Sequence, residues 1–145
     1  MTGDARTTLL DLVTHRRTAS LGTLHRGEPA VSMVPYALLP DGSGLVIHVS
    51  RLASHTADLL ASPRVSVMIA AAEEEGGDGG PQALPRIAIR GDAVELAGDE
   101  ADEAREAYLA RFPSAAPIFE LGDFLLIAIR PESVRVIAGF GAAST

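Results

Sequence analysis

The sequence predicts a mainly β domain of the α+β class, in which about six antiparallel strands close into a barrel or sandwich flanked by helices. Three observations predict it. Short runs of alternating apolar residues recur along the chain, turn sequences rich in glycine and proline separate them, and a few amphipathic stretches interrupt them. With 145 residues, 47% of them hydrophobic, the chain can bury one core, so residues 1–145 are expected to form a single domain.

The first third of the chain predicts one helix followed by a β-meander. Residues 4–17 carry leucines at helical spacing, with Asp4 or Thr7 as the expected N-cap. Extended runs follow, and turn residues at 25–28 and 40–44 separate them. The strands predicted here cover residues 19–24, 29–39 and 44–50.

The rest of the chain predicts further strands and two more helices. Residues 53–61 predict a short helix, and residues 99–112 predict a charged amphipathic helix with Leu109 and Phe112 facing inward. We expect the acidic, glycine-rich stretch 73–80 to be a mobile surface loop rather than a carboxylate metal site, because flexible glutamates do not preorganise ligands. The strands predicted here cover residues 64–71, 84–97, 124–130 and 133–138.

Composition excludes several classes of function. The absence of cysteine rules out disulfides, thiolate metal sites and thiol catalysis, and the absence of lysine rules out a lysine Schiff base. A net charge of −7 opposes partnership with nucleic acid or an anionic membrane, since both require a cationic surface. The first residues lack the pattern of a signal peptide and no apolar run is long enough to span a bilayer, so we expect a cytoplasmic protein.

The segment 48–56 carries the groups of a phosphate site. A predicted strand ends there and leads through a loop into the N-terminus of a helix, so backbone amides, hydroxyls and the Arg51 guanidinium come together. The structural alternative is that Ser54 or Thr56 only caps the helix while Arg51 is solvated. Both interpretations stay open at this point.

Five stretches, taken in order and spacing, carry a resemblance that covers nearly the whole chain: residues 31–37 (VSMVPYA), 50–56 (SRLASHT), 62–66 (SPRVS), 84–91 (LPRIAIRG) and 138–141 (AGFG). Together they resemble the pyridoxamine-phosphate-oxidase-like, FMN-binding split-barrel superfamily, and most closely its haem-utilisation branch. The resemblance implies a six-stranded antiparallel split β-barrel with flanking helices. It also implies a homodimer that holds FMN at the interface between its subunits.

The resemblance further implies which residues contact the cofactor. The strand that ends at Tyr36 would run along the flavin ring with its backbone, and Tyr36 is the aromatic residue expected nearest a bound ring. Ser54 and His55 would take the positions of the basic pair that usually binds the phosphate, and Arg51 would supply the positive charge. Arg86 would reach the cofactor of the other subunit. The implied cofactor-binding residues are Ser32, Met33, Val34, Pro35, Tyr36, Val49, Ser50, Arg51, Ser54, His55, Thr56 and Arg86.

The first functional hypothesis is an FMN-dependent oxidoreductase acting on a small molecule, in which the flavin carries the chemistry. No nucleophile–base pair is evident, so no catalytic residue is assigned. True pyridoxamine-phosphate oxidase activity is not expected, because the basic residue near Tyr36 and the C-terminal tryptophan and arginine of those enzymes are absent.

Two alternatives remain beside the FMN enzyme. One is a haem-binding or haem-degrading protein with His48 or His55 as the axial ligand of the iron. We expect no other metal site. The other is a non-enzymatic flavin carrier. Phe140, between two glycines, is expected either to plug the dimer or to contact a ligand.

Overall fold

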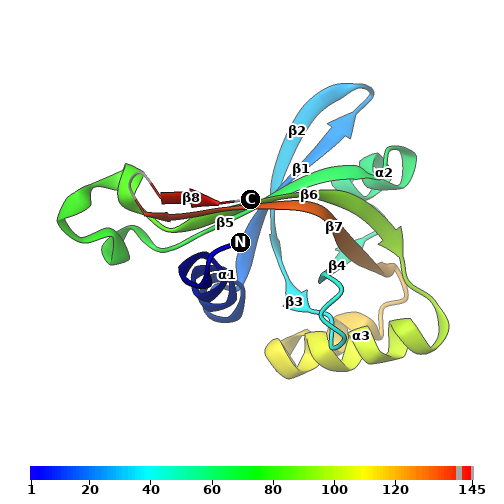
Figure 1. The fold of residues 1–145 in the computed structure, drawn as a ribbon. Coiled ribbons are helices and arrows are strands. Elements are labelled where there is room, and N and C mark those ends of the chain that lie inside the picture. The colour runs from blue at the N-terminus through cyan, green and yellow to red at the C-terminus, as the bar shows by residue number, and fades with distance from the viewer. Residues whose placement is uncertain (140–141, 145) are drawn as a thin grey trace.

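The computed structural model describes residues 1–139 and 142–144, and Phe140 therefore lies outside the described residues. One strongly twisted sheet forms the body of the molecule, and helices lie beyond its faces and ends (Figure 1). The strands are β1 (Thr18–His25), β2 (Glu28–Pro35), β3 (Ala37–Leu38), β4 (Leu45–Ser50), β5 (Arg64–Ala70), β6 (Arg86–Glu95), β7 (Phe124–Gly139) and β8 (Ala142–Ser144). The helices are α1 (Gly3–His15), α2 (Ser54–Ala61), α3 (Gly98–Arg111) and α4 (Ala116–Phe119), with 3-10 turns at η1 (Glu73–Gly79), η2 (Pro81–Ala83) and η3 (Pro113–Ala115).

The split-barrel prediction is confirmed. The sheet has eight strands in the order β2-β1-β5-β6-β7-β4-β3, with β8 paired to β7. Six of them are long, while β3 and β8 span two and three residues, which accounts for the difference from the six strands expected. The pairings are antiparallel.

The predicted β-meander is wrong. The run 29–39 divides at Tyr36, where the pairing with β1 ends in a last bond from the Tyr36 backbone N–H to the Arg17 carbonyl at 3.1 Å, and the next two residues pair with β4 instead. After this break, β4 pairs with β7 from the far end of the chain, in register from Leu45 opposite Ile129 to Ser50 opposite Phe124. The β1–β2 hairpin was predicted correctly, and Arg26 and Gly27 adopt the positive φ angles of 51° and 81° that its tight turn requires.

Other boundaries also differ from the predictions. The N-cap of α1 is Thr2, whose hydroxyl accepts from the Ala5 N–H at 3.1 Å, and not Asp4 or Thr7. The two strands predicted at 124–130 and 133–138 form the single strand β7, because a register shift next to Gly91 absorbs Pro131 without ending the pairing. The stretch 73–80, expected as a mobile surface loop, contains the 3-10 helix η1, where the Glu75 carboxylate accepts from the Ala72 N–H.

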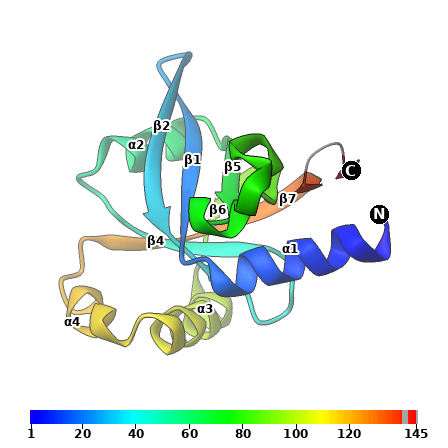
Figure 2. The same cartoon turned by 90° about the vertical axis from the view of Figure 1, so that its left-hand side faces the viewer.

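Two apolar cores stabilise the fold. The larger one fills the barrel with the inward-facing residues of the long strands and the buried face of α1. The smaller one lies between the β3–β4–β7 part of the sheet and α3, which runs below that part of the sheet (Figures 1 and 2). In α3 the fully packed residues are Ala104 and Tyr108, while Leu109 and Phe112, the residue that follows the helix, are partly buried in the same core. No helix in the described part of the chain is long and apolar enough to cross a membrane.

Candidate functional site

The loop between β4 and α2 contains only part of the predicted phosphate site. The Ser50 hydroxyl accepts from the Leu52 N–H at 3.1 Å, and the Thr56 hydroxyl donates to the Ser50 carbonyl at 2.5 Å. These two hydroxyls therefore shape the loop. Helix α2 begins after Ala53, which has no side-chain acceptor, so the predicted Ser54 or Thr56 cap is wrong and no side chain caps the amides of the first turn.

Few polar side chains remain at the surface of the corner between β4 and α2. Arg51 and Ser54 are exposed and His55 is half-buried, whereas Thr56 and Val49 belong to the interior. The Arg51 backbone N–H donates to the Asp123 carbonyl at 2.7 Å, which joins this loop to the start of β7. One guanidinium, one hydroxyl and one imidazole at a helix N-terminus can hold a single phosphate group.

Strand β2 presents its predicted site residues on two opposite faces. Met33 and Pro35 are exposed on the outer face of the sheet, whereas Ser32 and Val34 face inward. The Ser32 hydroxyl oxygen is buried and has no hydrogen-bond partner among the described residues. This hydroxyl is available to a cofactor that reaches the inner side of β2.

The Tyr36 side chain has no exposed surface, so the expectation that its ring lies beside a bound cofactor is wrong. Its hydroxyl lies 2.9 Å from the carbonyl oxygens of both Val13 and Arg16 at the end of α1. The Arg111 guanidinium lies over its ring, 4.9 Å from the centroid. Tyr36 therefore joins α1 to the barrel and to the end of α3.

Arg86, expected to reach a second subunit, binds its own segment in this chain. Its guanidinium donates to the carbonyl oxygens of Gln82 and Leu84, at 3.3 and 2.9 Å. The side chain therefore holds η2 against the start of β6.

His48 lies in an aromatic cluster of the smaller core. Its ring stacks on Phe119 with centroids 3.8 Å apart and planes 8° apart, and it also contacts Phe124 and Tyr108. Burial, together with the nearby Arg105 charge, lowers the pKa of His48 from 6.5 to about 4. The imidazole is therefore neutral at pH 7, and Phe119 is stacked on it.

The depressed pKa of His48 predicts a stability change in acid. Between pH 6.5 and about 4 the unfolded chain binds a proton that the folded chain does not, so stability falls as pH falls through this window. His48→Phe keeps an aromatic ring in the stack and removes this proton. We expect urea unfolding at pH 7.5 and pH 5.0 to show a larger loss for the wild type than for the variant, and an equal loss in both would contradict the assignment.

His25 is exposed, and its imidazole has a buried partner. Its Nδ1 lies 2.7 Å from the Asp58 Oδ1, and Asp58 on α2 is 8% exposed. The alternation of β1 places His25 on the same inward side as Leu21 and Thr23. The pair joins the tip of the β1–β2 hairpin to α2.

An open groove of about 560 Å³ lies on the outer face of β1, β2, β5 and β6. Leu24, Pro29, Val31 and Met68 supply large apolar side chains, and the residues between them are small. A Cβ atom at Gly22 would collide with the hydroxyl of Ser66, the neighbouring lining residue, so glycine leaves room for that side chain on the floor of the groove. Its size is within the range of about 300–1,000 Å³ that is usual for small-molecule sites.

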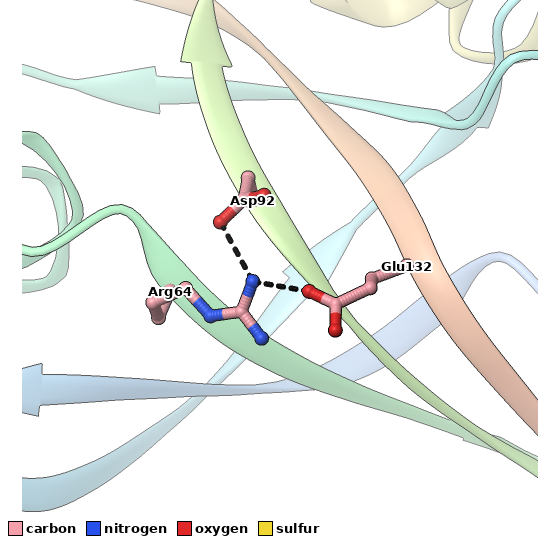
Figure 3. Close-up of polar contacts among 3 residues, drawn as sticks. All are labelled: Arg64, Asp92 and Glu132. Carbon is pink, nitrogen blue, oxygen red and sulfur yellow. Dashed lines mark hydrogen bonds and ion pairs between the residues drawn. The ribbon is translucent and has the colours of Figure 1, made fainter.

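Arginine supplies the charged groups that line the groove. Arg64 on β5 donates to Asp92 on β6 and Glu132 on β7, so that one guanidinium joins three strands (Figure 3). This contact with Arg64 lowers the pKa of Glu132 below its ordinary value. Arg90 lines the groove directly, and Arg135 is exposed on β7 opposite Ala88, another lining residue.

This groove was not predicted from the sequence, although the outward-facing residues of β2 indicate an apolar surface there. Successive outward positions of β2 are the apolar residues Val31 and Met33, which are 74% and 67% exposed. In a strand with one solvated face these positions are usually polar. In the described part of the chain, no group of three or more His, Asp or Glu side chains could hold a metal ion. Helix α2 and the groove lie on different faces of the β1–β2 hairpin.

Comparison with known proteins identifies relatives of this fold. The family described as pyridoxamine 5'-phosphate oxidase matches residues 6–138. The chain is 39% identical over 119 residues to the non-canonical heme oxygenase HOZ, chloroplastic, of Arabidopsis thaliana, an alignment that covers 82% of this chain and 35% of the relative. It is 29% identical over 134 residues to the heme oxygenase HutZ of Vibrio cholerae, covering 88% of this chain and 73% of the relative.

A solved structure is also similar over nearly the whole chain. The heme binding protein from Mycobacterium smegmatis superposes with a TM-score of 0.87 at 30% identity, covering 99% of this chain and 57% of that protein. The chain thus spans about a third of the length of the Arabidopsis relative and somewhat more than half of the mycobacterial one.

Proposed function

The chain belongs to the pyridoxamine 5'-phosphate oxidase family, in its haem-utilisation branch, and from this premise we propose that it binds haem as part of haem degradation. The observation that carries the proposal is the groove on the outer face of the sheet. Haem is a flat apolar ring with two carboxylates on one edge. The groove offers apolar side chains next to Arg90, and Arg135 is exposed on the adjoining strand opposite the lining residue Ala88, which matches both parts of that molecule.

The residues of the groove fit haem in chemistry and size. Val31, Met68 and Leu24 can cover one face of the ring, while guanidinium groups can pair with the carboxylates. When bound, haem supplies an iron centre for reaction with oxygen. The protein's own part is to hold the ring, cover it from water and neutralise its carboxylates.

FMN remains the second candidate, at a different place. The buried, unpartnered Ser32 hydroxyl and the corner formed by Arg51, Ser54 and His55 favour it. This corner provides one guanidinium where a phosphate dianion is best held by several cationic or amide donors. The named relatives support haem and not FMN.

Absorbance titration tests the proposed function. Adding haemin to the whole protein is expected to give a saturable Soret band near about 400 nm, and adding FMN is expected to leave the flavin bands near about 370 and 450 nm unchanged. Ala88→Trp should fill the groove and weaken haemin binding by about tenfold or more, whereas Leu52→Trp, at an 88% exposed position outside the groove, should not.

The same titration can reject the proposal. A wild-type protein with no saturable Soret band would contradict haem binding. Equal affinity in Ala88→Trp and wild type would place haem elsewhere on the chain. For the degradation part, ascorbate in air should bleach the bound Soret band faster than that of free haemin, and equal rates would contradict it.

We further propose that the groove lies at the interface of a homodimer. Val31 and Met33 on β2 and Met68 on β5 are exposed apolar residues on one face of the sheet, on the two sides of β1. An apolar ring in an open groove on this face needs cover on its second side. A second copy of the same face supplies that cover by two-fold symmetry. Haem would then lie between the two subunits.

Met33→Arg is expected to break this dimer, because it places a charge in the apolar face. Sedimentation should give twice the 15.1 kDa chain mass for wild type and the chain mass for the variant. Leu52→Arg is the matched control, since Leu52 is exposed but lies outside this face, and it should stay dimeric. A monomeric wild type, or a dimeric Met33→Arg, would overturn the proposed interface.

A further inference from the structure

Resting on the haem site proposed above, we infer that the groove recognises the porphyrin ring and its carboxylates and not the iron, so that metal-free porphyrins bind as tightly as haem. The inference follows from which atoms face the groove and where the metal-binding side chains of this chain lie. It extends the ligand class of the site from haem to dicarboxylate porphyrins in general.

The lining of the groove contains almost no side chain that can ligate haem iron. Protein ligands of haem iron are imidazole, thiolate, thioether and phenolate groups. Among the residues that line the groove there is no histidine, cysteine or tyrosine, and the one group of this kind is the Met68 thioether. The other lining side chains are aliphatic, hydroxyl-bearing or cationic.

The chain has four histidines, and all of them lie outside the groove lining. The Nδ1 of His15 contacts the Asp11 carbonyl within α1, and His25 pairs with Asp58 on the inward side of the hairpin. His48 is stacked on Phe119, and His55 lies on α2. No histidine of this chain is therefore placed to ligate an iron bound in the groove.

Met68 is better explained as an apolar contact than as a ligand. It lies between Ser20 of β1 and Ala88 of β6 in the ladder and is 46% exposed. A thioether is flexible and fits irregular apolar surfaces, and it is a weak ligand when no imidazole binds the opposite face. Its contribution to binding should therefore persist when the iron is removed.

Recognition then depends on the ring and the carboxylates. The ring is covered by the apolar side chains of β1, β2 and β5. Arg90 follows Ala88 by two residues on β6, and Arg135 lies opposite Ala88 on β7. The two arginines therefore form a diagonal cross-strand pair, a spacing that suits two carboxylates on one edge of a ligand. Arg64 is already held by Asp92 and Glu132, so it contributes less to a ligand.

The test is a parallel titration of the whole protein with haemin and with metal-free protoporphyrin IX, followed by absorbance and by porphyrin fluorescence. We expect dissociation constants within about threefold of each other. Met68→Leu should change both dissociation constants by the same factor, because the side chain contacts the ring and not the iron. Arg90→Ala should weaken both by about the same factor, roughly fivefold to tenfold, while Arg6→Ala on exposed α1 surface should weaken neither.

The outcomes separate this inference from the function on which it rests. Haemin binding more than about tenfold tighter than porphyrin binding, or a loss of haemin affinity alone in Met68→Leu, would overturn iron-independent recognition and leave haem binding intact. Binding of neither compound would overturn the proposed function itself. The comparison of two ligands in the wild type needs no variant, so a folding defect in a variant cannot obscure it.

Discussion

Gly91→Ala is expected to destabilise the fold by about 3 kcal/mol or more, because overpacking against rigid backbone leaves no side chain free to move aside. A Cβ atom at Gly91 would overlap the Arg130 carbonyl oxygen and would lie 3.0 Å from its carbon and 3.1 Å from the Pro131 Cα. The position is the register shift where β6 passes the proline of β7. Urea unfolding followed by circular dichroism measures the loss.

Gly3→Ala is the matched control for this prediction. Gly3 lies in the first turn of α1, and a Cβ atom there meets nothing within 4 Å. Its unfolding midpoint should equal or exceed that of the wild type, since alanine favours helix over glycine. If Gly91→Ala unfolds at the wild-type midpoint, the close approach of β6 to β7 is not a constraint on the fold.

Tyr36→Ala is expected to cost about 3–5 kcal/mol, the usual range for removing a large buried aromatic side chain. The side chain is fully buried, and its hydroxyl donates to one of the carbonyl oxygens of Val13 and Arg16. Burial raises the pKa of Tyr36 to about 12, so the hydroxyl keeps its proton throughout the neutral range. Arg111 adds donors to the Val13 and Thr14 carbonyls at the same helix end.

Tyr36→Phe divides this effect into packing and hydrogen bonding. It keeps the ring beneath Arg111 and removes only the hydroxyl, so the expected loss is about 1–2 kcal/mol. Haemin affinity should stay at the wild-type value in this variant, because Tyr36 has no surface exposed to the groove. A variant of wild-type stability that loses ligand binding would contradict the structural role and restore Tyr36 to the binding site.

The haem proposal and the FMN alternative use different faces of the β1–β2 hairpin. The groove lies on the outer face with Val31, whereas Ser32 and α2 lie on the inner one. Haem and FMN would therefore not compete for one site on this chain. A mixed titration in which FMN displaces haemin would contradict this separation.

The sequence by itself determined the local elements and the family. Alternating apolar residues marked the long strands, Ser62-Pro63 marked the end of α2, and the Arg26-Gly27 turn marked the first hairpin. These features depend on neighbours in the chain, so periodicity and turn chemistry are sufficient to predict them. The ordered set of five motifs was sufficient for the split-barrel family.

Only the tertiary structure decided which of the predicted site residues are available to a ligand. Tyr36 and Thr56 had the side chains of a binding site, yet contacts with α1 and with Ser50 commit them to the fold. The groove arises where β2 and β5 flank β1, and the pairing of β4 with β7 joins segments about eighty residues apart in the chain. Such pairings depend on packing over the whole barrel, which a local pattern of residues does not encode.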